Sequence, residues 1–132
     1  MPYPVVNGLR SIEFGTKGEM RNRLNSMVLH GSKRATAGLL KEDYLDQGEP
    51  LETVGEHLAM LDNEGNQIAT LVITRVEEVA FSEVSDAFAL AEAEGDLNGD
   101  DFRESHRRYW QSTGIQILDE TRVVTLYFDL EQ

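Results

Sequence analysis

The chain has 132 residues, a net charge of −12, 40% hydrophobic residues and no cysteine. This length and composition predict one folded domain over residues 1–132, and they exclude a disordered tail, a disulfide framework and thiolate chemistry. The first 14 residues lack a basic region followed by an apolar run, and no segment approaches the length of a membrane span. We therefore expect a soluble, cytoplasmic protein with no membrane partner.

The first half of the chain predicts one helix and one short strand. Apolar residues recur at helical spacing over 18–30, and Gly31 follows as a stop signal. Residues 34–40 are small and apolar, which favours a buried strand. Residues 41–50 are rich in turn formers.

The second half predicts further strands and two more helices. A hairpin signal at 62–66 separates strands at 57–61 and 67–81, the second of which is rich in β-branched residues. Ser82 is placed to cap a helix over 83–94, and Asn98 or Asp100 to cap another that reaches about residue 112. Residues 121–130 alternate well enough for a final strand. This order, with several antiparallel strands, predicts an α+β fold in which helices flank a small curled sheet or mixed β-barrel.

Charge is distributed unevenly along the chain. Residues 1–41 carry a net charge of +5, whereas the remaining residues carry −17. An acidic body repels long nucleic acids, so we expect no DNA duplex as partner. A local basic strip is compatible with one nucleotide-sized ligand, and it is equally the pattern of a solvated helix face.

The run from Gly31 to Thr36, GSKRAT, is a candidate for chemistry. Lys33 and Thr36 would share a pocket only if the backbone bends between them, because residues three apart point to opposite faces of a regular strand. A threonine becomes a nucleophile when a base lies beside it. The same run also fits a solvent-facing lysine and an ordinary strand threonine.

Glu92 and Glu94 form a second candidate group. On a continuous helix, residues two apart point in different directions, so both carboxylates are not expected to face one pocket. Glu94 lies closer than Glu92 to the apolar stripe of the helix, which favours Glu94 as the inward-facing acid. Glu92 is the alternative if the helix register differs.

The last predicted helix combines arginines with Tyr109 and Trp110, residue types that hold a base and its phosphate. A core stripe with arginines paired to nearby acids explains the same pattern. Tyr44 is a further candidate for stacking. The three histidines, His30, His57 and His106, are scattered over different elements, so we expect structural roles for them. No sequence motif specifies a metal or a cofactor.

The segments LHGSKRATAGLL, GEPLETVGEHLAML, DAFALAEAEGD and DDFRESHRRYW together resemble a bacterial ASCH-domain protein, from about Phe14 to Phe128. This resemblance implies a PUA-like β-barrel with the signature lysine in a cleft. It also implies an association with RNA, including ribonuclease members, and one small branch that removes the acetyl group of N4-acetylcytidine. The catalytic lysine, threonine and glutamate of that branch correspond to Lys33, Thr36 and Glu94. The chain differs from that compact branch in its longer N-terminal segment and in a helical insertion around 96–113.

Two functions follow as hypotheses. An amidohydrolase would use Thr36 as nucleophile, Glu94 as base and Lys33 as the cation for the oxyanion, with no metal and a nucleoside as substrate. An RNA-binding module or ribonuclease acting on short single-stranded RNA would use Ser32, Lys33 and Arg34 at a phosphate and Tyr109 or Trp110 at a base. A protein-interaction domain with an inactive cleft remains a third interpretation.

Overall fold

The computed structural model describes residues 3–131. In chain order, the elements are β1 (Val5–Val6), β2 (Leu9–Ile12), α1 (Glu19–Leu29), β3 (Ala35–Leu39), η1 (Leu40–Leu45), β4 (His57–Leu61), β5 (Gln67–Ala80), η2 (Phe81–Glu83), α2 (Asp86–Glu92), α3 (Gly99–Ser112) and β6 (Arg122–Leu130). None of the helices in this part of the chain is long and apolar enough to cross a membrane.

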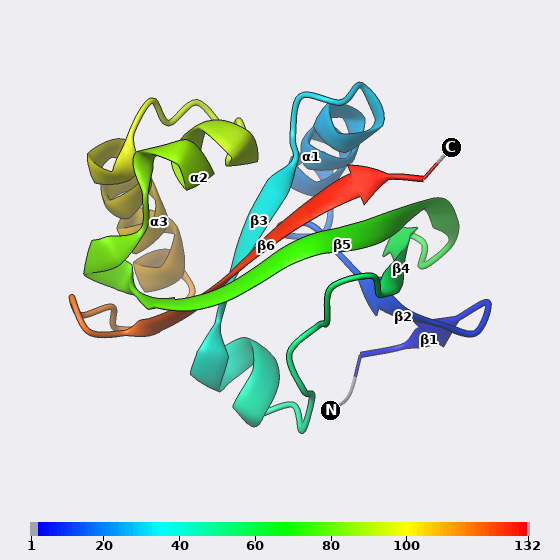
Figure 1. Ribbon diagram of the computed structural model, residues 1–132, viewed down its shortest axis with the longest axis horizontal. Helices are drawn as coiled ribbons and strands as arrows, with labels where there is room; N and C mark the ends of the chain where they lie inside the picture. The colour runs from blue at the N-terminus through cyan, green and yellow to red at the C-terminus, as the bar shows by residue number, and fades with distance from the viewer. Residues whose placement is uncertain (1–2, 132) are drawn as a thin grey trace.

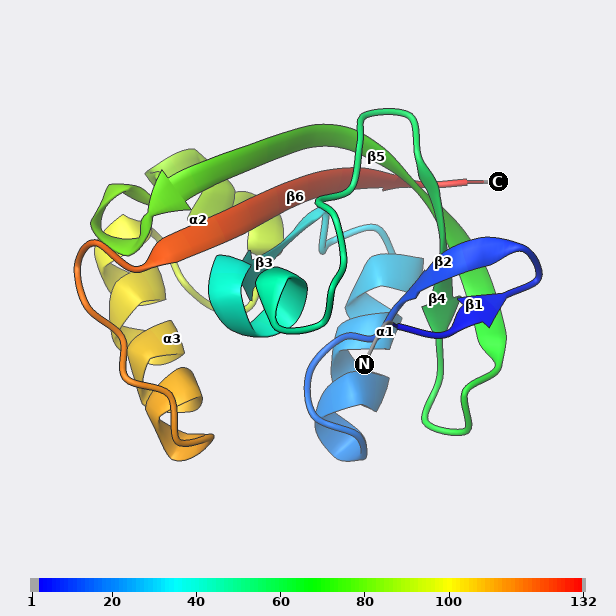
Figure 2. The same ribbon diagram turned by 90° about the horizontal axis from the view of Figure 1, so that it is seen from below.

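The six strands form one sheet in the order β1-β2-β4-β5-β6-β3. The long strands β5 and β6 pair with each other, and the register shifts at Met60/Leu61 and Ile73/Arg75. In Figure 2 these strands run across the top of the view, with α1, α3 and η1 all below them. The α+β expectation is confirmed. The sheet does not close into a barrel, however, because β1 and β3 are its two unpaired edges.

The N-terminal hairpin is absent from the sequence-based expectation. Asn7 and Gly8 both have positive φ, 53° and 79°, and join β1 to β2. An Asn-Gly pair is the characteristic signal for this two-residue turn, so the sequence did contain the information. Strand β2 then pairs in parallel with β4, so the sheet is mixed, as predicted.

Two further expectations differ from the structure. Ser85, rather than Ser82, caps α2 by accepting a hydrogen bond from the Phe88 backbone N–H, because 81–83 form a separate 3₁₀ turn. Residues 40–45, expected as part of a turn-rich stretch, form the short π-helix η1. The cap of α3 is Asn98, one of the two predicted candidates.

The hydrophobic interior has two parts. One cluster surrounds α1, β4 and the central strands and includes Phe14, Leu24 and Phe128. The other lies between the sheet and the pair α2 and α3, which stand at the left end of the molecule in Figure 1, and it includes Phe102 and Trp110. The space between these two clusters is where the protein's cavity lies.

Candidate active site

A cavity of about 550 Å³ lies beneath the sheet, with walls from α1, α3, β3, η1 and the segment after β2. Its lining includes Phe14 and Leu24 from one hydrophobic cluster and Trp110 from the other. This volume is within the range of small-molecule sites. The cavity therefore lies between the two hydrophobic clusters and is large enough for a nucleoside-sized ligand.

Lys33 is fully buried, with 0% of its surface exposed. Its Nζ donates to the Glu94 carboxylate at 2.6 Å, to the Ala35 carbonyl at 2.8 Å and to the Glu92 carbonyl at 3.3 Å. The Glu92 carboxylate lies 4.0 Å away. All three ammonium protons are thus in use. Lys33 lies behind the cavity wall and is not among the lining residues, whereas the family resemblance implied a lysine in the cleft itself.

Glu92 and Glu94 both line the cavity, which corrects the prediction that only one of them faces it. The helical-wheel argument was wrong because α2 ends at Glu92 and Ala93 adopts the left-handed conformation, with φ 59°. This change of backbone direction turns Glu94 back toward Lys33. A buried lysine paired with two carboxylates then fixes the end of the helix.

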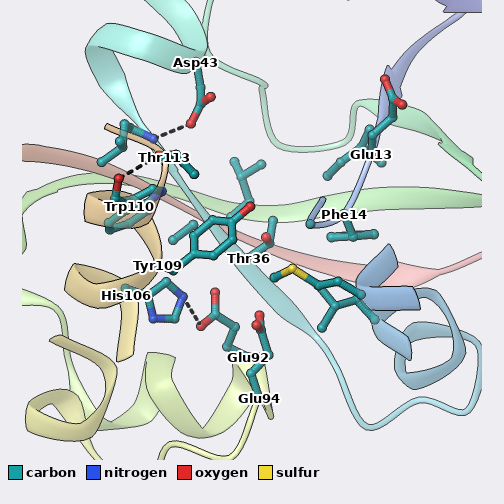
Figure 3. A pocket seen from close by; sticks show the side chains of 18 of the residues that line it. Glu13, Phe14, Thr36, Asp43, Glu92, Glu94, His106, Tyr109, Trp110 and Thr113 are labelled. Carbon is teal, nitrogen blue, oxygen red and sulfur yellow. Dashed lines mark hydrogen bonds and ion pairs between the residues drawn. The ribbon is translucent and has the colours of Figure 1, made fainter. Parts of the chain in front are cut away.

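His106 is the site residue that the sequence did not indicate. It lines the cavity, and its Nε2 lies 3.1 Å from Glu92 Oε1, as Figure 3 shows. Burial lowers the pKa of His106, but the hydrogen bond and charge of Glu92 and the charge of Glu94 outweigh it, so the net pKa is raised. Nδ1 lies 3.0 Å from the Phe102 carbonyl, which is consistent with a doubly protonated ring. Only the tertiary contact of α3 with α2 brings this histidine to the acids.

Thr36, Tyr109 and Trp110 all line the cavity. Thr36 is a half-buried residue of β3, and in Figure 3 it lies between Asp43 on one side and the two glutamates on the other. The Tyr109 hydroxyl lies 3.0 Å from Thr16 Oγ1 and so connects α3 with the segment before α1. Trp110 is only 7% exposed and packs edge-on against Phe81. Tyr109 therefore presents more ring surface to a ligand than Trp110 does.

Ser32 and Arg34 are not among the residues that line the cavity. The Ser32 hydroxyl donates to the Met27 carbonyl, and Arg34 binds the Gly31 carbonyl and Asp129 with its side chain 51% exposed. These three residues lie in the irregular segment before β3, in which Lys33 is buried and its two neighbours are exposed. The structure thus brings together Lys33, Thr36, Glu94, Tyr109 and Trp110 but not Ser32 or Arg34.

A second acidic group lines the other end of the cavity. Asp43 accepts a hydrogen bond from the Leu39 backbone N–H at 2.8 Å, and Glu52 accepts one from the Tyr44 hydroxyl at 2.7 Å. Burial raises the pKa of both carboxyl groups, more than these hydrogen bonds lower it. Burial and neighbouring acids also raise the pKa of the Tyr44 hydroxyl. Tyr44 is thus buried in this network and not exposed for stacking.

The described residues include one group with the composition of a metal site. Ligand atoms of Glu92, Glu94 and His106 lie within 4.8 Å of one another. Carboxylate and imidazole groups suit a divalent ion. The Lys33 ammonium at 2.6 Å from Glu94 already supplies a positive charge at this position, so an ion would have to displace it.

The fold and the site define the class of protein: it is an α+β domain in which a buried lysine anchors paired carboxylates at a cavity. The ASCH domain family model matches residues 10–132. The chain therefore belongs to the ASCH domain family.

Solved structures agree with this assignment. The chain has 26% identity to an ASCH domain from Lactobacillus crispatus JV V101, with a TM-score of 0.75 over 92% of this chain and 80% of that one. It has 30% identity to a DUF984 protein from Enterococcus faecalis V583, with a TM-score of 0.77 over 90% of this chain and 74% of that one. No curated protein matches the chain.

Proposed function

We propose that the protein hydrolyses the exocyclic amide of a modified nucleoside such as N4-acetylcytidine, giving cytidine and acetate. The observation that carries this proposal is the meeting of a strand hydroxyl, Thr36, with a carboxylate held by a buried lysine, Glu94, at one cavity. A nucleophile, a base and a residue that orients the base are the parts that acyl transfer requires.

The charge of the cavity supports an unphosphorylated substrate. Five carboxylates line it, whereas Arg23 is the one Lys or Arg residue among the described residues that line it, since Lys33 lies behind the wall. A phosphate would be repelled, and a neutral nucleoside would not. This lining disfavours the alternative of a ribonuclease that grips the backbone of single-stranded RNA in this cavity.

In the first step, Thr36 Oγ1 attacks the acetyl carbonyl carbon and its proton passes to Glu94. The tetrahedral intermediate then collapses, which breaks the bond between the acetyl carbon and N4. Glu94 returns the proton to N4, so cytidine leaves and an acetyl ester of Thr36 remains. In the second step, water attacks the ester while Glu94 accepts its proton. Collapse releases acetate and restores the threonine hydroxyl.

Lys33 acts in this mechanism chiefly through Glu94. Two hydrogen bonds to backbone carbonyls hold its ammonium group and a third fixes the Glu94 carboxylate, so in this arrangement Lys33 is a positioning residue without direct contact to the substrate. Its positive charge still favours a developing oxyanion through space, because little water separates groups in a buried site. His106 similarly orients Glu92.

The test is turnover of N4-acetylcytidine followed by chromatography, with Thr36→Val and Thr36→Ser as a matched pair. Valine keeps the shape of threonine but removes the nucleophile, so activity should fall by about 10³-fold or more, whereas serine should retain part of it. Mass spectrometry of quenched enzyme should detect acetylation at position 36 only where a hydroxyl is present. A chelator should leave the rate unchanged. No cytidine release at enzyme concentrations comparable to substrate would overturn the proposal.

A further inference from the structure

The cavity has a polar end that the proposed hydrolysis does not use. Asp43, Glu52 and Glu13 line this end, and Figure 3 shows Asp43 and Glu13 across the cavity from Glu92 and Glu94. We call Asp43, Glu52 and Glu13 the distal acids. Glu13 is paired with Arg21 at 2.9 Å, whereas Asp43 and Glu52 form no ion pair with a Lys or Arg side chain among the described residues.

The backbone and its neighbours hold the distal acids in place. The Leu39 N–H fixes Asp43 and the Tyr44 hydroxyl fixes Glu52, while the Tyr3 hydroxyl donates to the Asp43 carbonyl at 2.7 Å. A carboxylate accepts as many as about four hydrogen bonds, so both side chains retain capacity for a ligand. Both side chains are only partly exposed, and placing such groups there without a cation opposes folding unless a ligand compensates.

Ser11 provides a second, independent observation at the same cavity. Its side chain is only 5% exposed, it lines the cavity, and its hydroxyl oxygen has no hydrogen-bond partner among the described residues. The Ser11 backbone N–H bonds the Pro4 carbonyl, and Pro4 follows Tyr3, whose hydroxyl donates to the Asp43 backbone carbonyl. A buried hydroxyl without a partner is costly unless a ligand or water satisfies it.

We propose that the distal acids and Ser11 bind the vicinal hydroxyls of a ribose. Carboxylates accept hydrogen bonds from ribose hydroxyls in dinucleotide-binding proteins, and they repel the phosphate of a nucleotide. The inference rests on the proposed function for the position of the base, which would lie against Tyr109 with its acyl group toward Thr36. The substrate class is then an unphosphorylated ribonucleoside, rather than a free base or a nucleotide.

The test measures binding by calorimetry, so it does not depend on turnover. Cytidine should bind the unmodified protein roughly ten- to a hundredfold more tightly than 2′,3′-dideoxycytidine or cytosine, since each lost hydrogen bond is to a charged acceptor. Cytidine 5′-monophosphate should bind more weakly than cytidine. Glu52→Gln and Asp43→Asn should weaken cytidine binding while changing dideoxycytidine binding little. Glu78→Gln, at the surface pair with Arg122, is the matched control.

The two proposals fail in different ways. Equal binding of cytidine and dideoxycytidine, or no cytidine binding at millimolar concentration, would overturn the ribose site even if acetyl hydrolysis is found. Discrimination between the two nucleosides without any hydrolysis would support the ribose site and contradict the amidohydrolase.

Discussion

Lys33 stabilises the fold as well as the site, and this complicates the usual alanine test. Replacing it by methionine would leave the partly buried Glu94 carboxylate without a cation and the buried Glu92 carboxylate with His106 alone. We expect Lys33→Met to lower the free energy of unfolding by about 3–5 kcal/mol, a large part of a typical domain's stability. The double variant Lys33→Met/Glu94→Gln should recover part of this loss, because one unpaired charge is removed. Urea denaturation of both variants measures the difference; equal stability of Lys33→Met and the unmodified protein would contradict the pairing.

Glu52 should oppose folding at neutral pH. Burial raises its pKa above the ordinary 4.5, so the folded state binds its proton more strongly than the unfolded state does. Stability from this group is present below about pH 4.5 and is lost as pH rises through the raised pKa, by about 1.4 kcal/mol for each unit of pKa shift. Glu52→Gln should therefore be more stable than the unmodified protein at pH 7 and show less gain at pH 4. Urea midpoints at both pH values test this, and a variant destabilised at pH 7 would contradict it.

Among the elements, the end of α2 is the strained one. Ala93 adopts φ 59°, a conformation that is unfavourable for a residue with a Cβ. We expect Ala93→Gly to raise the free energy of unfolding by roughly 0.5–1 kcal/mol, measured from the urea midpoint. Gly95 is the matched control for the opposite substitution, because its φ is 99° and a Cβ at this position would meet open space. Gly95→Ala should destabilise by a similar or larger amount. A destabilised Ala93→Gly would show that the Ala93 methyl group contributes more by packing than its backbone strain opposes.

The same helix end shows what the sequence can and cannot predict. The main helices and strands follow from local periodicity, so α1, β4, β5, α3 and β6 are close to their predicted bounds. Local periodicity also led to the wrong prediction that only one of Glu92 and Glu94 faces the cavity. An alanine in the left-handed region has no sequence signal, whereas a glycine there would have had one. The amidohydrolase residues came from family resemblance, which contains no information on where Ser32 and Arg34 point.

Long-range pairing accounts for the remaining differences. The parallel contact of β2 with β4 and the approach of His106 to Glu92 join segments that share no local pattern. Asp43 falls in the predicted turn-rich segment, and Glu52 and Glu13 were not singled out, because no local sequence pattern shows that these acids face a cavity.

At the scale of the whole molecule, the acidic character of the protein provides a test, based on salt dependence, that distinguishes a nucleoside enzyme from an RNA-binding protein. The net charge is −12, and five carboxylates but only one Lys or Arg residue, Arg23, are among the described residues that line the cavity. Turnover of an uncharged nucleoside should change less than about twofold between 50 and 300 mM salt, because no counterions are released on binding. A short single-stranded RNA that contacts several phosphates should instead lose affinity steeply over the same range. Measuring both on the same protein decides between the classes: salt-independent turnover with negligible RNA affinity fits the nucleoside site, and tight, salt-sensitive RNA binding would contradict it.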